Sequence, residues 1–473
     1  MTTTFALLLL GALLLRVSTF GDPNLHSDEA FYHTVGATMH HGVLPYVDVW
    51  DRKPLGLFIL YFLVAGISTA PIAYQLAATA FAAATACVIA MIARRWTTPV
   101  GGLLAGVCYL FMLGPLQGFG GQAPVFYNLF IALAALLVLR GRPALRKGTA
   151  PPAVATAMLL AGLAVTMKTT ALFEGCYLGL AATHTLWRSG ARPAHVWATA
   201  ALWMLIGAGP SLAIAAAYAI SGHWPEYWQA VVLSNFAKTA AWSVAWMRLK
   251  VLVVLLVPLG GLAWLGLRRQ TTDRGFVMGW LAAGTVGLCS LPNFHLHYAL
   301  PLSVPLFVAA SSALSRVSFG AAATAALAIV SVAMSSPFDF GHTARSRAAL
   351  ERLAASARTH LNGGPLLLYD APPQLYAWTG EPFATPLVFP THLSHLAERD
   401  VSHLSTTSEI RRVLARRPGA VIMAQLTPSP LINEETHQLV LAYVGRNCRL
   451  IDVAPAYERL GTDTFAVWGD CRR

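Results

Sequence analysis

Charged residues are scarce in this sequence, and acidic residues are the scarcest over most of its length. Charged side chains make up 11% of the chain and hydrophobic residues 56%, and the mean hydropathy is +0.56. Soluble domains carry about a quarter of charged residues. Outside residues 21–54, only three acidic residues precede residue 337. These shortages exclude a globular soluble enzyme and predict a polytopic α-helical membrane protein in a lipid bilayer.

Signatures of several other functions are missing too. No CxxC or Cys/His spacing indicates a metal site, and no glycine-rich phosphate loop follows a predicted strand. The net charge of +12 is not gathered into one patch for nucleic acid. The basic residues form small clusters between apolar runs, at Arg94-Arg95, 140–147, Arg188 and Arg192, 268–274, and Arg316. Such clusters mark cytoplasmic loops of membrane proteins. We therefore expect no nucleic-acid partner, no metal and no other cofactor.

Apolar segments follow one another through residues 4–336. A membrane span needs about 20 apolar residues, and the basic clusters set the orientation of each span. Residues 4–20 are interpreted as a retained first span. Residues 55–67 are interpreted as a re-entrant or interfacial segment, because a full crossing there would place every later basic cluster outside. The other spans are 72–93, 99–116, 123–140, 152–168, 169–187, 195–220, 248–267, 276–292, 297–314 and 318–336, which gives about eleven crossings.

Residues 221–247 are rich in aromatic side chains rather than in long aliphatic runs. Four tryptophans and a tyrosine lie in this segment, Trp224, Tyr227, Trp228, Trp242 and Trp246. Tryptophan and tyrosine are enriched where the bilayer meets water. We therefore expect a helix lying at the outer membrane interface.

The chain changes character after residue 336. Residues 337–473 contain 14 arginines, no lysine and 13 acidic residues, a nearly neutral composition. Helical patterns at 343–361, 408–419 and 434–445, the last capped by Asn433, alternate with short apolar strands, which predicts a small α/β domain. The crossings place this C-terminal domain outside the cytoplasm. Cys448 and Cys471 lie in it and can form a disulfide in an oxidising compartment.

Five acidic residues occur together in residues 21–54. They are Asp22, Asp28, Glu29, Asp48 and Asp51. Carboxylates beside a membrane are costly to bury, so a group of them is a candidate functional site. The alternative is a solvated loop that happens to be acidic. The crossings place this stretch on the same side of the membrane as the C-terminal domain.

The pair Asp28-Glu29 opens an amphipathic helix, with Phe31, Val35 and Met39 on one face. A carboxylate on the first turn, at the boundary between water and membrane, can act as a general base toward a hydroxyl or an amine. The alternative is an ordinary helix start, with Ser27 or Asp28 as the cap and acid near the positive end of the helix dipole.

Basic residues and histidines on the same predicted side could bind an anion. Lys53 follows Asp51 directly, and it is either a point-charge partner for phosphate or a lysine anchor at the membrane surface. Lys168 ends a span on the outside, where the positive-inside rule does not favour lysine. His295, His297 and Tyr298 share an outer loop, in which a histidine can donate to phosphate, carry protons or serve packing alone.

The segment DEAFYHTVGATMHHGVLPYVDVWDRKPLGLFIL resembles a family signature. It is similar to the C-type (GT-C) membrane glycosyltransferases that use polyprenyl-phosphate sugars, such as bacterial aminoarabinose transferases and protein O-mannosyltransferases. The shared features are the acidic pair, Tyr32, the Gly-x-x-Pro-Tyr turn ending at Tyr46, and Asp51-Arg52-Lys53-Pro54. The glycine-rich run ending in Lys168, His297-Tyr298 and residues 370–390 are also similar. Two departures are Leu55 in place of a second proline, and Gln122 and Asn128 where relatives often carry an acid.

This resemblance implies a membrane glycosyltransferase with a GT-C domain at 1–336, its catalytic first outer loop at 21–54, and an extracytoplasmic α/β domain at 337–473. The donor would be a polyprenyl-phosphate monosaccharide and the acceptor an envelope lipid, glycan or protein. The implied residues are Asp28 and Glu29 for catalysis, Lys53, Lys168 and His297 for donor phosphate, and Tyr32, Tyr46, Asp48, Asp51, His295 and Tyr298 for substrate. A lipid-linked-sugar flippase without chemistry is the alternative.

Overall fold

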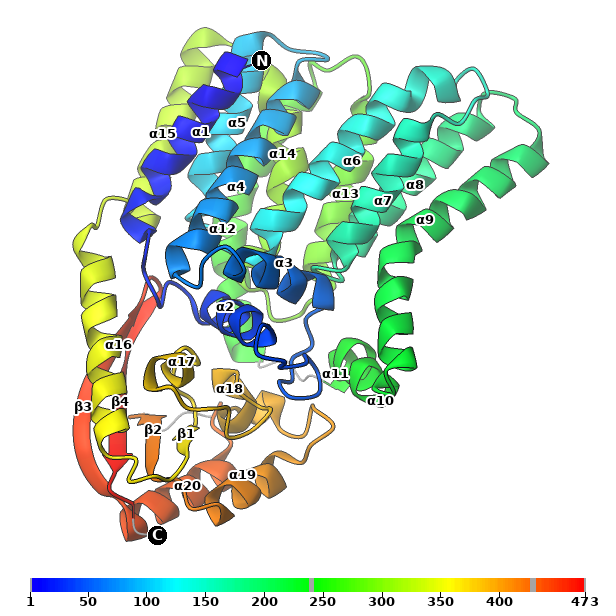
Figure 1. The fold of residues 1–473 in the computed structure, drawn as a ribbon. Coiled ribbons are helices and arrows are strands. Elements are labelled where there is room, and N and C mark those ends of the chain that lie inside the picture. The colour runs from blue at the N-terminus through cyan, green and yellow to red at the C-terminus, as the bar shows by residue number, and fades with distance from the viewer. Residues whose placement is uncertain (1, 238–241, 426–430, 472–473) are drawn as a thin grey trace. The chain divides into compact units, whose positions relative to one another are not determined.

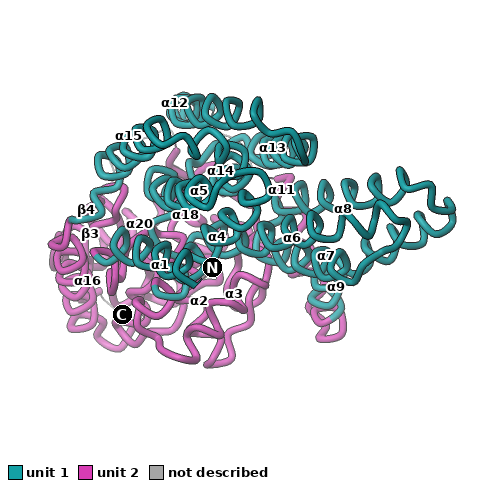
Figure 2. The backbone as a smooth tube through the Cα atoms, turned by 90° about the horizontal axis from the view of Figure 1, so that it is seen from above, with its two compact units in different colours: residues 1–17, 76–216, 242–338 teal, residues 18–75, 217–241, 339–473 magenta. Residues whose placement is uncertain are grey.

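The computed structural model describes residues 2–237, 242–425 and 431–471. Its backbone forms two compact units, each assembled from separate parts of the chain (Figure 2). Unit 1 consists of residues 1–17, 76–216 and 242–338. Unit 2 consists of residues 18–75, 217–241 and 339–473. It therefore includes residues 21–54, which we call the acidic stretch, and nearly all of residues 337–473, which we call the tail.

Unit 1 is a bundle of apolar helices (Figure 1). Its helices are α1 (Thr2–Arg16), most of α4 (Pro71–Ala93), α5 (Pro99–Leu113), α6 (Ala123–Leu145), α7 (Pro152–Val165), α8 (Ala171–Trp187), most of α9 (Pro193–Ile220), α12 (Trp242–Leu267), α13 (Arg274–Cys289), α14 (Leu300–Leu314) and α15 (Val317–Ser335). Helix α14 packs against α5, α12 and α13, and each of its residues is buried. A helix that is apolar on all sides takes such a central position.

Seven helices in the described part of the chain are long and apolar enough to cross a membrane. They span Thr2–Thr19, Pro71–Ala93, Ala123–Leu145, Pro193–Ile220, Trp242–Leu267, Leu296–Leu314 and Val317–Ser335. The prediction of a multi-pass membrane protein is therefore confirmed, while the count of eleven crossings stays a prediction. Helix α3 (Leu55–Ala65) has only 11 residues, and at 1.5 Å per residue it is about half as long as a bilayer core is thick.

The basic clusters that set the predicted orientation meet at one end of the bundle. Asp273, just before α13, accepts hydrogen bonds from Arg95 after α4 and from Arg142 in the last turn of α6. Trp96 donates to Ser311 near the end of α14 at 3.1 Å. Four predicted cytoplasmic ends thus lie side by side, as the alternating crossings require.

Unit 2 contains a four-stranded sheet in the order β1-β2-β4-β3. Strand β1 (Leu366–Leu368) runs parallel to β2 (Ala420–Ala424), and β4 (Gly461–Gly469) runs antiparallel to both β2 and β3 (Arg449–Glu458). The tail helices are α16 (Gly341–Thr359), α17 (Leu375–Thr379), α18 (Pro390–Ser394), α19 (Thr406–Ala415) and α20 (Glu434–Asn447). This small sheet with helices agrees with the α/β pattern of the tail sequence. Asn433 occupies the N-cap position of α20, as predicted, but its side chain makes no capping hydrogen bond.

The tail also holds the chain that precedes helix α2 (Ser27–Met39). The Asn24 side chain donates to the carbonyl of Tyr457 at 3.2 Å and accepts from Gln374 at 2.9 Å. The Ser346 hydroxyl donates to the Asp22 carboxylate at 2.7 Å. Because Asp22 and Asn24 are fully buried, these bonds satisfy polar groups that would otherwise be costly. The start of the acidic stretch is therefore a structural part of unit 2.

The predicted interfacial helix at 221–247 is wrong in its extent. Unit 2 has a short helix α10 (Trp224–Trp228), a π-helical turn at Gln229–Leu233 and α11 (Ser234–Ala237). Residues 238–241 lie outside the described residues. Trp242 and Trp246 belong to α12. They form its first turns, and the helix continues from them into the long apolar run that follows.

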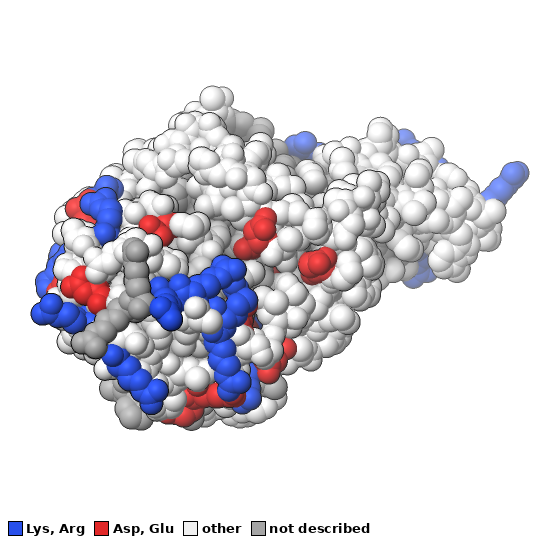
Figure 3. Space-filling model, turned by 60° about the horizontal axis from the view of Figure 1, so that its bottom comes forward, with Lys and Arg blue, Asp and Glu red and all other residues white. Residues whose placement is uncertain are grey.

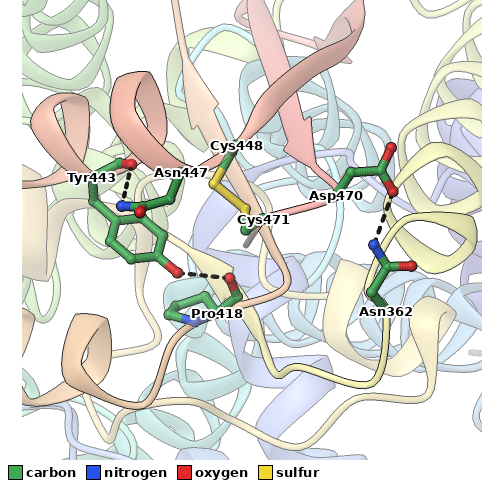
Figure 4. The surroundings of a disulfide bond; sticks show 7 residues. All are labelled: Asn362, Pro418, Tyr443, Asn447, Cys448, Asp470 and Cys471. Atoms are coloured by element: carbon green, nitrogen blue, oxygen red, sulfur yellow. Dashed lines mark hydrogen bonds between the residues drawn. A yellow bond between two sulfur atoms is a disulfide. The ribbon is translucent and has the colours of Figure 1, made fainter. Parts of the chain in front are cut away.

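A disulfide joins Cys448, which follows α20, to Cys471, which follows β4 (Figure 4). Nearby, the Tyr443 hydroxyl donates to the carbonyl of Pro418 at 2.9 Å, and Asn362 donates to Asp470 at 3.0 Å. The bond closes the end of the tail onto its sheet, as the two tail cysteines allowed.

The surface of the tail carries both signs of charge. Figure 3 shows lysine and arginine side chains gathered on the face that includes the tail, with acidic side chains beside them. Arg411 in α19 is exposed, as are Arg416 and Arg417 directly after it and Arg446 in α20. A surface of this kind suits a domain that faces water.

Candidate active site

The acidic stretch folds into an ion cluster around one lysine. The Lys53 ammonium lies 3.2 Å from Asp28 Oδ1 and 3.1 Å from Asp51 Oδ2. Asp28 comes from the first turn of α2, and Lys53 and Asp51 come from the turn before α3. We call Asp28, Asp51 and Lys53 the Lys53 cluster. The sequence singled out all three residues, and the structure brings them together.

The local sequence explains the shape of the turn that carries Lys53. Asp51 Oδ1 accepts a hydrogen bond from the main-chain N–H of Lys53 at 2.8 Å. An aspartate that binds the backbone two residues on forms a local turn of its own. Pro54 then occupies the N-cap position of α3. The sequence Asp-Arg-Lys-Pro therefore presents the lysine at a fixed place directly before a helix.

Aromatic rings surround the Lys53 ammonium. Its nitrogen lies 4.7 Å from the ring centre of Phe389, 5.1 Å from Tyr32 and 5.8 Å from Phe31. Rings at these distances attract a cation through their negative faces. Burial by itself lowers the pKa of Lys53, but the carboxylates of Asp51 and Asp28 outweigh it, so the pKa is raised. Lys53 is therefore a charged lysine in a largely apolar wall.

His26 caps helix α2, so the predicted cap at Ser27 or Asp28 is wrong. The Nδ1 atom of His26 accepts the main-chain N–H of Asp28 at 3.1 Å. Burial lowers the pKa of His26, which keeps the ring neutral and its Nδ1 able to accept. The histidine thus performs the capping, while the Asp28 carboxylate faces Lys53.

Asp28 and Glu29 lie in different surroundings, although the sequence presents them as a pair. Glu29 is fully buried, and its surroundings include Tyr61, Tyr74 and Glu458. Successive residues of a helix point in different directions. Asp28 therefore belongs to the Lys53 cluster, and Glu29 to the interior of unit 2.

Tyr46 supports the cluster from behind. Its hydroxyl donates to the carbonyl of Lys53 at 2.8 Å, and its ring packs against Tyr218 and Tyr227. Burial raises the pKa of Tyr46 well above its usual range. Its φ of 72° is left-handed, a conformation that costs a residue other than glycine roughly 1–2 kcal/mol. Strain of this kind is kept where the surroundings fix a functional position.

Two further predicted substrate residues of the acidic stretch differ in exposure. Tyr32 is buried between Lys53 and Phe58. Asp48 is exposed, and its carboxylate accepts the main-chain N–H of Leu44 at 2.8 Å. Asp48 therefore shapes the turn before Asp51 and does not join the Lys53 cluster.

The remaining predicted residues form a second cluster, which lies in unit 1. The Lys168 ammonium lies 4.8 Å from the ring centre of Tyr298. His295 stacks on His297, and both rings contact Tyr298. The structure thus brings together Lys168 from the end of α7 and the histidine loop before α14.

Arg248 is a member of this second cluster that the sequence analysis missed. Its Nη1 lies 3.1 Å from Nε2 of His295 and 3.4 Å from the carbonyl of Asn293. We call Lys168, Arg248, His295, His297 and Tyr298 the Arg248 cluster. The signal was in the sequence, because Arg248 stands at the predicted outer end of a span, where the positive-inside rule disfavours it as it does Lys168.

The tail contributes residues that the sequence analysis also missed. Phe389 forms part of the wall around Lys53, and His392 lies 3.8 Å from Asp51. Glu398 forms a two-pronged ion pair with Arg52. Only residues 370–390 had drawn notice, through the resemblance, and nothing in the local pattern of His392 or Glu398 distinguishes them.

Two solved structures share the fold of this chain. No protein-family model matches the sequence, and no curated protein does. The structure of ArnT from Cupriavidus metallidurans in the apo state matches with a TM-score of 0.62 and 15% identity, over 98% of each chain. The structure of the same protein bound to undecaprenyl phosphate matches with a TM-score of 0.64 and 13% identity, over 98% of this chain and 97% of that one.

These matches establish the fold. The aminoarabinose transferase ArnT has a GT-C fold, so the GT-C architecture that the sequence resemblance implied is confirmed. The similarity extends over 98% of the chain and therefore includes the tail. Because the identities are low, what the fold does in this protein is argued from its residues.

Proposed function

We propose that this protein is a glycosyltransferase that moves a monosaccharide from a polyprenyl-phosphate donor to an envelope acceptor at the outer face of the membrane. The observation that carries the proposal is the Lys53 cluster, in which the Asp28 carboxylate lies 3.2 Å from a lysine surrounded by aromatic rings. The chain that holds this cluster has the fold of ArnT. The undecaprenyl phosphate bound to ArnT supports the class of donor.

The reaction would be an inverting displacement at the anomeric carbon. Asp28 accepts the proton of the acceptor hydroxyl or amine, and the freed electron pair forms the new bond to that carbon. The bond from the anomeric carbon to the phosphate oxygen breaks on the opposite face. Polyprenyl phosphate leaves with the electron pair, and Glu29 is the buried neighbour of Asp28 in the first turn of α2.

Cations would stabilise the charge that grows on the departing phosphate. We assign this role to Lys53 and, as the family resemblance implies, to Lys168 and His297; Arg248 belongs to the same cluster as the latter two. Fixed positive groups of this kind act most strongly where water is excluded. Lys53 binds Asp28, and a donor phosphate that attracts Lys53 would release Asp28 to act as the base.

The remaining residues would contact substrate or hold those that do. The proposed substrate contacts are Tyr32, Asp48, Asp51, His295 and Tyr298. Tyr46 contributes through Lys53, because its hydroxyl already bonds the lysine carbonyl.

The proposed location is the cytoplasmic (inner) membrane, with the Lys53 cluster and residues 337–473 on the extracytoplasmic side. Two observations support this orientation. The Cys448–Cys471 disulfide suits an oxidising compartment. Arg95 and Arg142 share one end of the bundle, as cytoplasmic loops do.

Two linked experiments test the proposed function. Mass spectrometry of envelope lipids and glycans from a deletion strain should reveal one missing sugar and its acceptor. The deletion strain is then complemented with wild type, with Asp28→Asn and with Glu351→Gln, an exposed residue of α16 that serves as charge control.

We expect Asp28→Asn to lower transfer by about 100- to 10,000-fold, the usual contribution of a general base. The protein should still fold, and Glu351→Gln should behave as wild type. A flippase without chemistry would keep working with asparagine at position 28, so normal transfer by Asp28→Asn would overturn the proposal.

A further inference from the structure

The short loop that ends at Lys53 also contacts the tail, in addition to the local turn that Asp51 forms. Three consecutive residues of that loop, Trp50, Asp51 and Arg52, each contact residues 386–398. The main-chain N–H of Trp50 donates to the carbonyl of Pro386 at 2.8 Å. The sequence separation exceeds 330 residues, so no local rule sets these contacts.

His392 occupies the centre of this contact. Its side chain is only 4% exposed. Its Nε2 lies 3.8 Å from Asp51 Oδ2, and its ring meets the ring of Trp50 edge to face at 4.7 Å. Asp51 is the carboxylate that binds both the N–H and the ammonium of Lys53. Asp51 therefore lies between the His392 side chain and the Lys53 ammonium.

The ionisation state of His392 suits such a position. Burial lowers its pKa to about 4, against the opposing effect of Asp51 and Glu398. A neutral imidazole leaves the negative charge of Asp51 to Lys53. A charged imidazole would compete with the lysine for the same carboxylate.

Contacts on both sides of His392 fix the segment that carries it. On one side, Phe389 lies against the Lys53 ammonium at 4.7 Å. On the other side, Glu398 is bound by Arg52 through both of its oxygens, a geometry that restrains direction as well as distance. Gln229 adds a further link, since it accepts from Trp50 at 3.1 Å and donates to the carbonyl of Val401 at 2.6 Å.

We propose that residues 386–398 of the tail position the Lys53 cluster, with His392 as a positioning residue that packs on Trp50 and lies beside Asp51, and so limits where Asp51, and through it Lys53, can lie. Glu398 is a second positioning residue, which acts through Arg52. This inference rests on the proposed function, because it assigns a role in the same reaction. On this proposal, the tail supplies residues that position the site.

The test compares two replacements of His392 in the full-length protein in its membrane. Leucine removes the imidazole nitrogens, whereas the amide nitrogen of glutamine stands near the place of Nε2. We expect His392→Leu to lower kcat by about 10- to 100-fold and to raise KM for the donor, as small misplacements of reacting groups do. His392→Gln should restore most of the activity. His437→Leu, a half-buried tail histidine beside Tyr369, serves as the control.

The outcomes separate this inference from the proposed function. If His392→Leu has the kcat and KM of wild type per folded molecule, His392 is structural only and the inference fails, even when Asp28→Asn is inactive. If Asp28→Asn is active, the proposed function itself fails. Should the leucine variant not fold, His392→Gln is compared with His392→Asn. Higher activity of the glutamine variant supports positioning by Nε2, and equal activities contradict it.

The Arg52–Glu398 pair offers an independent check by charge reversal. Arg52→Glu or Glu398→Arg alone should lower kcat by about tenfold, because each places like charges together. The double variant should recover activity. Failure to recover in a folded double variant would remove Glu398 from the proposal.

Discussion

The Lys53 cluster and the Arg248 cluster differ in the partners that their cations contact. In unit 2, Lys53 lies between the carboxylates of Asp28 and Asp51. In unit 1, Arg248 contacts an imidazole nitrogen and a main-chain carbonyl, and it forms no ion pair with a carboxylate within the described residues. In the proposed mechanism, a lysine bound by acids suits proton transfer, since an arriving anion would draw the lysine away and free the acid. An arginine that contacts an imidazole and a carbonyl but no carboxylate among the described residues suits the binding of an anion directly.

A third group of cations, also in unit 1, shows what a structural role looks like. Arg95 and Arg142 both bind Asp273, whose side chain is 7% exposed. Their charges are already neutralised at the end of the bundle where the other basic clusters lie. The partner of each basic residue, more than its presence, therefore distinguishes the candidate site from the predicted cytoplasmic loops.

The largest effect should come from breaking the acid-bound cluster. Lys53→Met should lower transfer by about 100- to 1,000-fold, because it removes a charge proposed to stabilise the leaving phosphate. It should also cost about 3–5 kcal/mol of stability, because two carboxylates lose their shared cation. A transfer assay and thermal unfolding measure the two effects. Lys250→Met, which removes an exposed lysine from α12, is the control; equal activity of the two variants would refute the role of Lys53.

The next prediction compares Arg248, which contacts no carboxylate among the described residues, with Arg142, which binds Asp273. Arg248→Gln should raise KM for the donor by about tenfold, about 1.4 kcal/mol of binding, with little change in stability. Arg142→Gln should leave KM unchanged and lower stability by about 1 kcal/mol, as for an ordinary ion pair. Steady-state kinetics with both variants decide the matter. The comparison fails if both variants change KM equally.

Double variants extend this comparison to both clusters. If Lys53 and Arg248 act on the same phosphate, the loss in the variant that lacks both should differ from the sum of the two single losses in free energy. Independent roles would give additive losses. The kinetic cycle of wild type, two single variants and the double variant measures the coupling.

Removing the disulfide should change stability without changing the clusters. Cys448 and Cys471 are 23 residues apart, and closing a loop of that length contributes about 3 kcal/mol in the chain-entropy description. The double serine variant should therefore unfold at lower temperature. Its kcat per folded molecule should equal that of wild type, because the bond lies at the far end of the sheet from the segment that contacts Lys53. A loss of kcat would contradict that separation.

The smallest effect concerns a carboxyl close to the acid-bound cluster. Burial, followed by the charges of Asp463, Asp28 and Glu29, raises the pKa of Glu458 from 4.5 to about 8. The folded protein therefore holds a proton that the unfolded chain releases near pH 4.5. Stability from this group is complete below pH 4.5 and is lost as the pH rises through 8. Thermal unfolding between pH 6 and 8.5 should show a decline in wild type that is smaller in Glu458→Gln; equal declines would exclude Glu458 as the source.

Much of the fold was accessible from the sequence because it follows from local rules. Long apolar runs require helices in a membrane, since a backbone in lipid must satisfy its own hydrogen bonds. The basic clusters then fixed which helix ends lie together, and Asp273 unites Arg95 and Arg142 as that pattern required. The strands and helices of the tail were also visible in its alternating pattern. The interfacial helix failed because aromatic content alone does not show where one helix stops and another begins.

The sequence by itself determined the chemistry of the candidate site: the acidic stretch, the turn from Asp51 to Pro54, and the place of Lys168 at the end of an apolar run. These are matters of composition, charge and near-neighbour spacing. Only the tertiary structure decided that His26 rather than Ser27 or Asp28 caps α2, that Asp28 and Glu29 face different surroundings, and that the tail supplies His392 and Glu398. The contacts of His392 and Glu398 with Asp51 and Arg52 join residues hundreds of positions apart. No local pattern encodes them, because packing selects such partners through the whole fold rather than through their neighbours in sequence.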